Sequence, residues 1–265
     1  MAPGAPIGIF DSGIGGITVA NAIVGLLPGE TLCYFGDTAH VPYGGKSADT
    51  ITRYSLDITA FLLDQGCKAI VVACNTASAA ALPTLRHTWP AVPIIGMEPA
   101  VKPAATATRS GVVGVLATRG TFSSERYASL MERYAHGVVI LENPCVGLVE
   151  LIEAGLVDDP ATESFLQQIL TPMIEQGADT FVLGCTHYPL VRPLIERIVP
   201  PGAAIIDPAP AVARQLQRRL QQLDLLNDQR SGTHQMYVSG DLQSFKIMAE
   251  RFFCGSFLLE QHLFH

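Results

Sequence analysis

The sequence is short of charge, and of positive charge in particular. Only 15% of its 265 residues are charged, and 24 acidic residues outnumber 17 Lys and Arg residues, which gives a formal net charge of −7. No run of Lys or Arg interrupts this pattern. Because nucleic-acid binding depends on basic side chains that neutralise phosphates, we expect no nucleic-acid partner.

The sequence also lacks an export signal and a membrane span. It has no stretch of about 18 consecutive apolar residues, and residues 1–10 show no basic region followed by a long apolar one. Its six cysteines are dispersed without a CxxC pair, which is typical of reduced thiols and provides no zinc-type ligand pair. We therefore expect a cytoplasmic protein with no membrane partner and no bound metal.

Short strands that alternate with longer helices predict an α/β fold. Apolar runs rich in β-branched residues fit parallel strands that are covered by helices on both faces. The strands are expected at residues 6–10, 31–35, 69–73, 92–96, 111–116, 137–141, 180–184 and 204–206. The helices are expected at residues 16–27, 47–65, 77–88, 123–134, 162–176, 191–198 and 209–225.

Two parts of the chain repeat each other. DQGCKAIVVACNT (64–76) lies over EQGADTFVLGCTH (175–187) without a gap, PIIG (93–96) lies over AIID (204–207) at the same offset, and IGIFDSG (7–13) resembles VGVLATR (113–119). The repeat predicts two similar, doubly wound α/β domains with mainly parallel sheets, related by a pseudo-twofold axis, with the active site in the crevice between them. A proline-rich boundary and a long tail predict a first domain of residues 1–97 plus 209–265 and a second domain of residues 98–208.

The repeat places a cysteine after the same strand in each half. Cys74 and Cys185 each follow an apolar run, and the carboxyl ends of parallel strands are where α/β proteins bind ligands. A thiol near a helix N-terminus ionises more easily, and His187 stands two residues after Cys185, where it can hold or receive a proton. We expect Cys74 and Cys185 to take part in catalysis and the other four cysteines to be structural.

Asp11 precedes a glycine-rich turn, SGIGG (12–16), whose function the sequence leaves open. One interpretation is a dinucleotide fingerprint, with Asp37 near the distance expected for a ribose-binding acid. Against it, Thr18 stands where G-x-G-x-x-G/A requires a small residue, and Asp11 would repel a pyrophosphate. The other interpretation is that Asp11 is catalytic, with Ser12 and backbone amides holding a ligand carboxylate. A capping Asp or Ser fits either interpretation.

Two further segments carry polar groups whose roles the residues alone do not decide. GDTAHVPYGGKS (36–47) is a turn-rich loop with backbone suited to anion binding. Glu150 and Glu153 lie on the edge of one expected helical turn, where solvated glutamates are the common case.

Five motifs together resemble bacterial glutamate racemases of the aspartate/glutamate racemase superfamily. They are IFDSGIGG (9–16), GDTAHVPYG (36–44), ACNTASA (73–79), ATRGTFSSERY (117–127) and GCTHYPL (184–190), and the resemblance covers residues 7–207. It implies an enzyme without a cofactor that interconverts L-glutamate and D-glutamate, its small-molecule substrate, and supplies D-glutamate for the peptidoglycan of the cell wall. It also implies a homodimer.

The resemblance assigns roles to residues as well. Cys74 and Cys185 would be the two catalytic thiols, acting on D-glutamate and L-glutamate respectively, with Asp11 supporting the first and His187 the second. A third supporting carboxylate falls on Glu153, with Glu150 as the alternative because Val146 stands where the family usually has proline. The substrate-binding residues implied are Asp11, Ser12, Pro42, Tyr43, Gly44, Asn75, Thr76, Thr118, Thr121, Thr186 and His187.

Racemisation fits the residues, because inverting a carbon requires an acid and a base on opposite faces. No lysine stands at a strand end, where a pyridoxal cofactor would need one. Three alternatives remain: an aspartate or hydantoin racemase, a two-lobed small-molecule-binding protein without reactive thiols, and a regulator of a nucleic-acid enzyme. Some members of the family need a peptidoglycan-precursor activator and have an N-terminal extension; the early first strand makes us expect an enzyme without obligatory activation.

Overall fold

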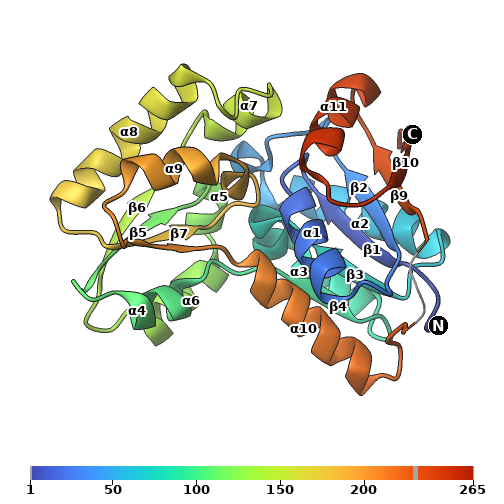
Figure 1. Ribbon diagram of the computed structural model, residues 1–265. Helices are drawn as coiled ribbons and strands as arrows, with labels where there is room; N and C mark the ends of the chain where they lie inside the picture. The colour runs from blue at the N-terminus through green and yellow to red at the C-terminus, as the bar shows by residue number, and fades with distance from the viewer. Residues whose placement is uncertain (1, 229–231, 265) are drawn as a thin grey trace.

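The computed structural model describes residues 2–228 and 232–264, and it contains two parallel β-sheets (Figure 1). The first sheet has the strand order β10-β9-β2-β1-β3-β4 and the second has the order β6-β5-β7-β8. The strands of the first are β1 (Ile7–Asp11), β2 (Leu32–Gly36), β3 (Ala69–Val72), β4 (Ile94–Gly96), β9 (His234–Val238) and β10 (Phe257–Gln261). Those of the second are β5 (Val112–Leu116), β6 (Val139–Asn143), β7 (Thr180–Leu183) and β8 (Ala204–Ile206).

The strand order of the second sheet repeats part of the first. The sequence β2-β1-β3-β4 corresponds to β6-β5-β7-β8, and every strand pair in both sheets is parallel. The prediction of an α/β fold with two mainly parallel sheets is therefore confirmed.

Helices cover both faces of each sheet, as runs that are apolar on both faces require. On the first sheet, α2 (Ala48–Asp64) and α3 (Asn75–Thr88) pack on one face, and α1 (Ile17–Leu26), α10 (Ala209–Gln222) and α11 (Leu242–Phe252) pack on the other. On the second sheet, α4 (Val101–Ala107) and α6 (Glu125–Tyr134) face α7 (Leu148–Glu153), α8 (Pro160–Glu175) and α9 (Arg192–Ile198) across the strands. Short turns complete the chain: α5 (Arg119–Phe122), η1 (Tyr43–Gly45) and η2 (Tyr188–Val191).

The tail begins with the expected helix, α10, and continues with elements that the sequence did not predict. After α10 it forms β9, α11 and β10, and the two strands extend the first sheet beyond β2. On this sheet membership we propose the division expected above, residues 1–97 plus 209–265 and residues 98–208. Of those ranges, residues 1, 229–231 and 265 lie outside the described residues.

Two smaller differences have local causes. The second-half strand expected at 137–141 is β6, at Val139–Asn143, because Gly137 adopts a φ of 74° that ends the preceding turn rather than starting a strand. The proline-rich segment expected as a turn begins helix α4 at Val101, with Pro103 in its first turn, where a missing N–H is tolerated. Within the described ranges, no helix combines the length and apolarity needed to cross a bilayer.

Candidate active site

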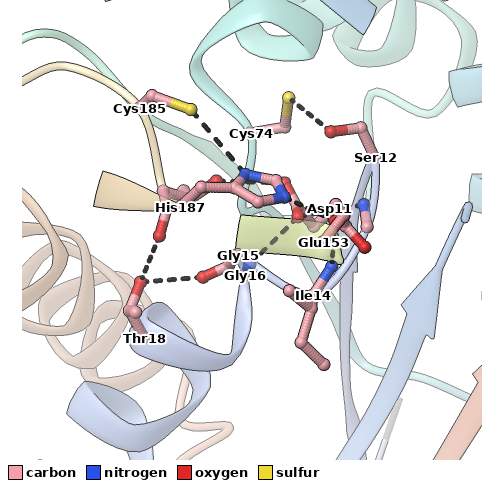
Figure 2. Close-up of polar contacts among 12 residues, drawn as sticks. Asp11, Ser12, Ile14, Gly15, Gly16, Thr18, Cys74, Glu153, Cys185 and His187 are labelled. Carbon is pink, nitrogen blue, oxygen red and sulfur yellow. Dashed lines mark hydrogen bonds and ion pairs between the residues drawn. The ribbon is translucent and has the colours of Figure 1, made fainter. Parts of the chain in front are cut away.

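Cys74 lies where β3 ends and α3 begins. Its sulfur accepts a hydrogen bond from the Ala77 amide at 3.4 Å, which caps the helix, and its thiol contacts Ser12 Oγ at 3.8 Å (Figure 2). Burial and the nearby charge of Asp11 raise the pKa of Cys74 well above its usual value, although the Ala77 amide acts in the opposite direction. Cys74 is therefore held as a neutral thiol in the protein alone.

Cys185 has a different partner. It lies just beyond β7, and its sulfur is 3.7 Å from His187 Nδ1, while His187 Nε2 is 2.6 Å from Glu153 Oε1 (Figure 2). Burial disfavours the charged imidazole, but the hydrogen bonds to Cys185 and Glu153 and the charges of these groups outweigh it. They raise the pKa of His187 well above its usual value. A protonated His187 places a positive charge beside the Cys185 sulfur.

Asp11 lies at the end of β1 between the two cysteine sites and is fully buried. Its Oδ2 accepts from the amides of Gly13 at 3.1 Å and Gly16 at 3.0 Å, and its Oδ1 accepts from Thr186 Oγ1 at 3.2 Å. Burial raises the pKa of Asp11, and the charge of His187 and the Gly16 amide partly offset this rise. Asp11 thus connects the first half of the chain to the second through Thr186.

The glycine-rich turn after β1 fits closely against the second half. A Cβ on Gly13 would lie 1.9 Å from Glu153 Oε1, and a Cβ on Gly15 would lie 2.4 Å from His187 Nδ1. Thr18, which breaks the dinucleotide pattern, donates to the Thr186 carbonyl at 3.2 Å. These glycines therefore allow the acid–base residues of the second half to approach.

Three backbone amides of this turn donate to protein carboxylates. Those of Gly13 and Gly16 donate to Asp11, and that of Ile14 donates to Glu153 Oε1 at 2.9 Å. The turn thus needs no pyrophosphate or substrate carboxylate to account for its glycines. Tyr34 Oη donates to the Gly13 carbonyl at 2.9 Å and fixes the turn from β2, a contact that no sequence pattern indicated.

Threonines from both halves meet beside this centre. Thr76 Oγ1 is 2.8 Å from Thr118 Oγ1, which is 3.2 Å from Thr121 Oγ1, and Thr118 caps the short helix α5. Gly44 packs on Thr118 so closely that a Cβ there would be 2.9 Å from the Thr118 Cβ. The structure therefore brings these four expected binding residues together.

Asn75 has the least satisfied side chain of the site. It is 3% exposed, and neither its amide oxygen nor its amide nitrogen has a hydrogen-bond partner in the part of the chain that the structure describes. Buried polar groups are ordinarily paired, so this amide is available to a ligand.

Three other expected residues lie differently. Tyr43 is buried and its hydroxyl donates to Asp37 Oδ2 at 2.5 Å. Pro42 lines a cavity of about 170 Å³ together with Glu150, which is exposed and does not contact His187 in any described hydrogen bond. Of the two candidate carboxylates, Glu153 is thus the one that reaches His187.

No cluster of three or more His, Cys, Asp and Glu side chains suited to a metal ion occurs among the described residues.

Comparison with known proteins gives consistent matches along the chain. The family model described as Asp/Glu/Hydantoin racemase matches residues 18–216. A glutamate racemase of Ectopseudomonas mendocina is 54% identical over 239 residues, covering 90% of this chain and 91% of the relative.

Solved structures agree with this match. The crystal structure of Escherichia coli glutamate racemase in complex with L-glutamate and the activator UDP-MurNAc-ala has a TM-score of 0.87, 33% identity and 98% coverage of both chains. The glutamate racemase of Francisella tularensis in complex with D-glutamate has a TM-score of 0.84 and 32% identity, and it covers 99% of this chain and 98% of that one.

Proposed function

Because the chain belongs to the glutamate racemases of the Asp/Glu/hydantoin racemase family, we propose that it interconverts L-glutamate and D-glutamate by two-base proton transfer through Cys74 and Cys185. No cofactor takes part in this proposal. Lys68, which is fully buried, precedes β3 at the end of the strand opposite Cys74 and pairs with Glu30 at 2.6 Å, so it is not placed to form a Schiff base near the thiols.

The observation that carries the proposal is the pairing of two strand-end cysteines with unlike partners. Burial and Asp11 raise the pKa of Cys74, and a protonated His187 lies beside Cys185. One thiol and one thiolate are the acid and the base that inversion of a carbon requires. The charge of Cys185 also raises the pKa of Cys74.

The proposed reaction moves one proton off each substrate molecule and one proton onto it. The Cys185 thiolate removes the Cα proton of L-glutamate, and the Cys74 thiol donates its proton to the opposite face of the resulting carbanion, giving D-glutamate. Cys185 is then a thiol and Cys74 a thiolate, which is the form that converts D-glutamate back. Asp11 supports proton transfer at Cys74, and His187, oriented by Glu153, supports it at Cys185.

The remaining polar residues bind and orient the substrate in this proposal. The free amide of Asn75, with Ser12, Thr76, Thr118, Thr121 and Thr186, offers donors and acceptors to the carboxylates and ammonium of glutamate. A carbanion next to a carboxylate needs preorganised dipoles and the exclusion of water. The burial of both cysteines, 5% and 7% exposed, provides that exclusion.

The substrate assignment follows the relatives, whose complexes hold L-glutamate and D-glutamate. We infer further that the D-glutamate is used for peptidoglycan, that the protein acts in the cytoplasm, and that it is a homodimer. Sedimentation equilibrium of the purified protein tests the dimer, since a single species of 28.3 kDa would contradict it.

The test of the mechanism compares Cys74→Ser and Cys185→Ser with Cys254→Ser, which alters an exposed cysteine away from the site. Purified proteins under reducing conditions in heavy water receive L-glutamate, D-glutamate or L-aspartate, and optical rotation and Cα deuteration are followed. We expect the control and wild type to racemise and deuterate glutamate and the two site variants to lose racemisation. A site variant with full activity would refute the two-thiol mechanism. If wild type is inactive alone but active with UDP-MurNAc-ala, the enzyme depends on an activator. If wild type is inactive even with UDP-MurNAc-ala, the proposed function is refuted.

A further inference from the structure

Asp37 follows β2 directly and lies at the level of Asp11 in the first sheet. Its backbone amide donates to the Asp11 carbonyl at 2.9 Å, and its side chain is 1% exposed. A carboxylate in this position faces the carboxyl ends of the strands, where the reacting residues lie. The proposed proton transfers do not use it.

Each oxygen of the Asp37 carboxylate is bound by the protein. Oδ2 accepts from the Tyr43 hydroxyl at 2.5 Å, Oδ1 accepts from Ser239 Oγ at 2.7 Å, and His40 Nδ1 lies 2.8 Å from Oδ1 and 3.0 Å from Oδ2. Hydrogen bonds to an ionised acceptor are roughly twice as strong as neutral ones. Asp37 therefore connects the base of the loop to Tyr43 at its tip and to Ser239 in the tail of the chain.

The tail of the chain completes this anchor. Ser239 follows β9, its Oγ accepts from the Ala39 amide at 3.0 Å, and the next residue, Gly240, donates its amide to Thr38 Oγ1 at 3.1 Å. β9 pairs with β2 in the first sheet, so Ser239, which follows β9, lies beside Asp37, which follows β2 (Figure 1). The loop of residues 38–46 is thus held at its base from two strands.

The tip of the same loop touches the second half of the chain. Tyr43 and Gly44 lie in the turn η1, where Gly44 packs on Thr118, and Thr118 is hydrogen-bonded to Thr76. The Tyr43 hydroxyl is occupied by Asp37, and its side chain is 1% exposed. What this loop presents to the crevice is therefore its backbone and Gly44, not the Tyr43 hydroxyl.

We propose that Asp37 is a positioning residue that sets the 42–44 turn against Thr118 and so controls the affinity for substrate, through the Tyr43 hydroxyl. This inference rests on the proposed function. Gly44 of this turn packs on Thr118, one of the proposed substrate-binding residues, so we expect the turn to affect substrate binding more than proton transfer. Loss of the anchor should raise KM for L-glutamate and D-glutamate by the same factor and leave both kcat values nearly unchanged.

The decisive variants are Asp37→Asn, Tyr43→Phe and their combination. Asparagine has one acceptor oxygen where aspartate has two, so either Tyr43 or Ser239 loses its acceptor, and phenylalanine removes only the hydroxyl while keeping the ring. We expect each single variant to raise both KM values about three- to tenfold, and the double variant to raise them by less than the product of the two single effects, because both changes weaken the same Tyr43–Asp37–Ser239 anchor. Asp57→Asn, on the exposed side of α2, is the control for loss of one charge and should behave as wild type.

Three results would overturn the inference. They are unchanged KM values in Asp37→Asn, a rise for one enantiomer only, and effects of the two single variants that multiply in the double variant. General destabilisation would lower the active fraction and hence the apparent kcat, not KM, so it is distinguishable from positioning.

Amide hydrogen exchange of residues 38–46 gives a readout that needs no activity. It should be faster in Asp37→Asn and Tyr43→Phe than in wild type, and unchanged exchange would refute the anchor. If wild type does not racemise glutamate, the proposed function fails by itself and this exchange experiment still decides whether Asp37 holds the loop.

Discussion

Replacement of Glu153 by glutamine separates the charge of this residue from its shape. Glu153 Oε1 is 2.6 Å from His187 Nε2 and also accepts from the Ile14 amide at 2.9 Å, and its side chain is 18% exposed. Glutamine retains an acceptor for both contacts. What is lost is the negative charge that helps to raise the pKa of His187.

The size of the effect follows from that one change. A hydrogen bond to a charged group contributes about 1.5–3 kcal/mol and a neutral one about 1 kcal/mol, so the difference is roughly 0.5–2 kcal/mol. That corresponds to roughly a two- to thirtyfold lower kcat/KM. Because the two enantiomers have the same free energy, kcat/KM must fall by the same factor in both directions.

A kinetic isotope effect shows which proton transfer has become slow. With His187 less able to support Cys185, removal of the Cα proton by Cys185 should limit the rate. The isotope effect on kcat/KM should then grow for L-glutamate deuterated at Cα and shrink for deuterated D-glutamate. Circular dichroism follows the reaction from either enantiomer in ordinary water.

Glu150→Gln is the matched control, since Glu150 is exposed on the same helix. We expect it to racemise like wild type. A slow Glu150→Gln with a normal Glu153→Gln would reverse the assignment of the third carboxylate. A Glu153→Gln whose isotope effect grows for D-glutamate would show that His187 does not serve the cysteine that acts on L-glutamate.

Three further predictions concern packing and protonation. Gly15→Ala places a Cβ 2.4 Å from His187 Nδ1, so the imidazole must move and kcat/KM should fall by about 100-fold or more with an unchanged far-ultraviolet spectrum; full activity would contradict the close fit. Lys68→Met leaves the buried carboxylate of Glu30 without its cation and should lower the free energy of unfolding in urea by about 3–5 kcal/mol, and adding Glu30→Gln should restore much of it; a neutral single variant would show that the pair is dispensable. The folded-state pKa of His187 is raised, so protonation of His187 stabilises the fold fully below the ordinary pKa of histidine, and this stabilisation is lost as pH rises through the raised pKa. The free energy of unfolding should therefore fall over that pH range in wild type and fall less in His187→Asn. Equal slopes in the two proteins would contradict the raised pKa.

Much of the fold was predictable because the strands are short apolar runs in a regular rhythm. The eight strands expected in the first 208 residues all occur, within two residues at their ends. The tail was harder to predict. β10 is an edge strand whose residues are half-buried or exposed, and β9, next to it, alternates buried and half-buried residues, so their apolar pattern is weak. A signal for α11 was present, however, since Asp241 accepts from the Ser244 amide as an N-cap ahead of apolar residues spaced for a helix.

The site divides in the same way into local and long-range features. The alignment of the two halves indicated Cys74 and Cys185 from the sequence, because each follows its strand directly. The alignment did not indicate that amides after Asp11 donate to protein carboxylates. It also did not indicate that Asp37 accepts a hydrogen bond from Ser239, which is 202 residues away. Such contacts are made between segments distant in the chain, and no periodicity records them. The glycines drew attention for ligand binding, whereas the structure uses them for close approach of Glu153 and His187.

Each half places a cysteine at the end of a strand, but the electrostatic surroundings of the two cysteines differ, and the proposed two-base mechanism requires such a difference. Two neutral thiols would offer no base, and two thiolates would offer no acid. The residue two positions after the cysteine is Thr76 in one half and His187 in the other, and the carboxylate at the end of β1 has only Ala117 as its counterpart after β5. Asp11 therefore raises the pKa of Cys74, while a protonated His187 lies beside Cys185, so the duplicated scaffold places opposite charges beside its two thiols.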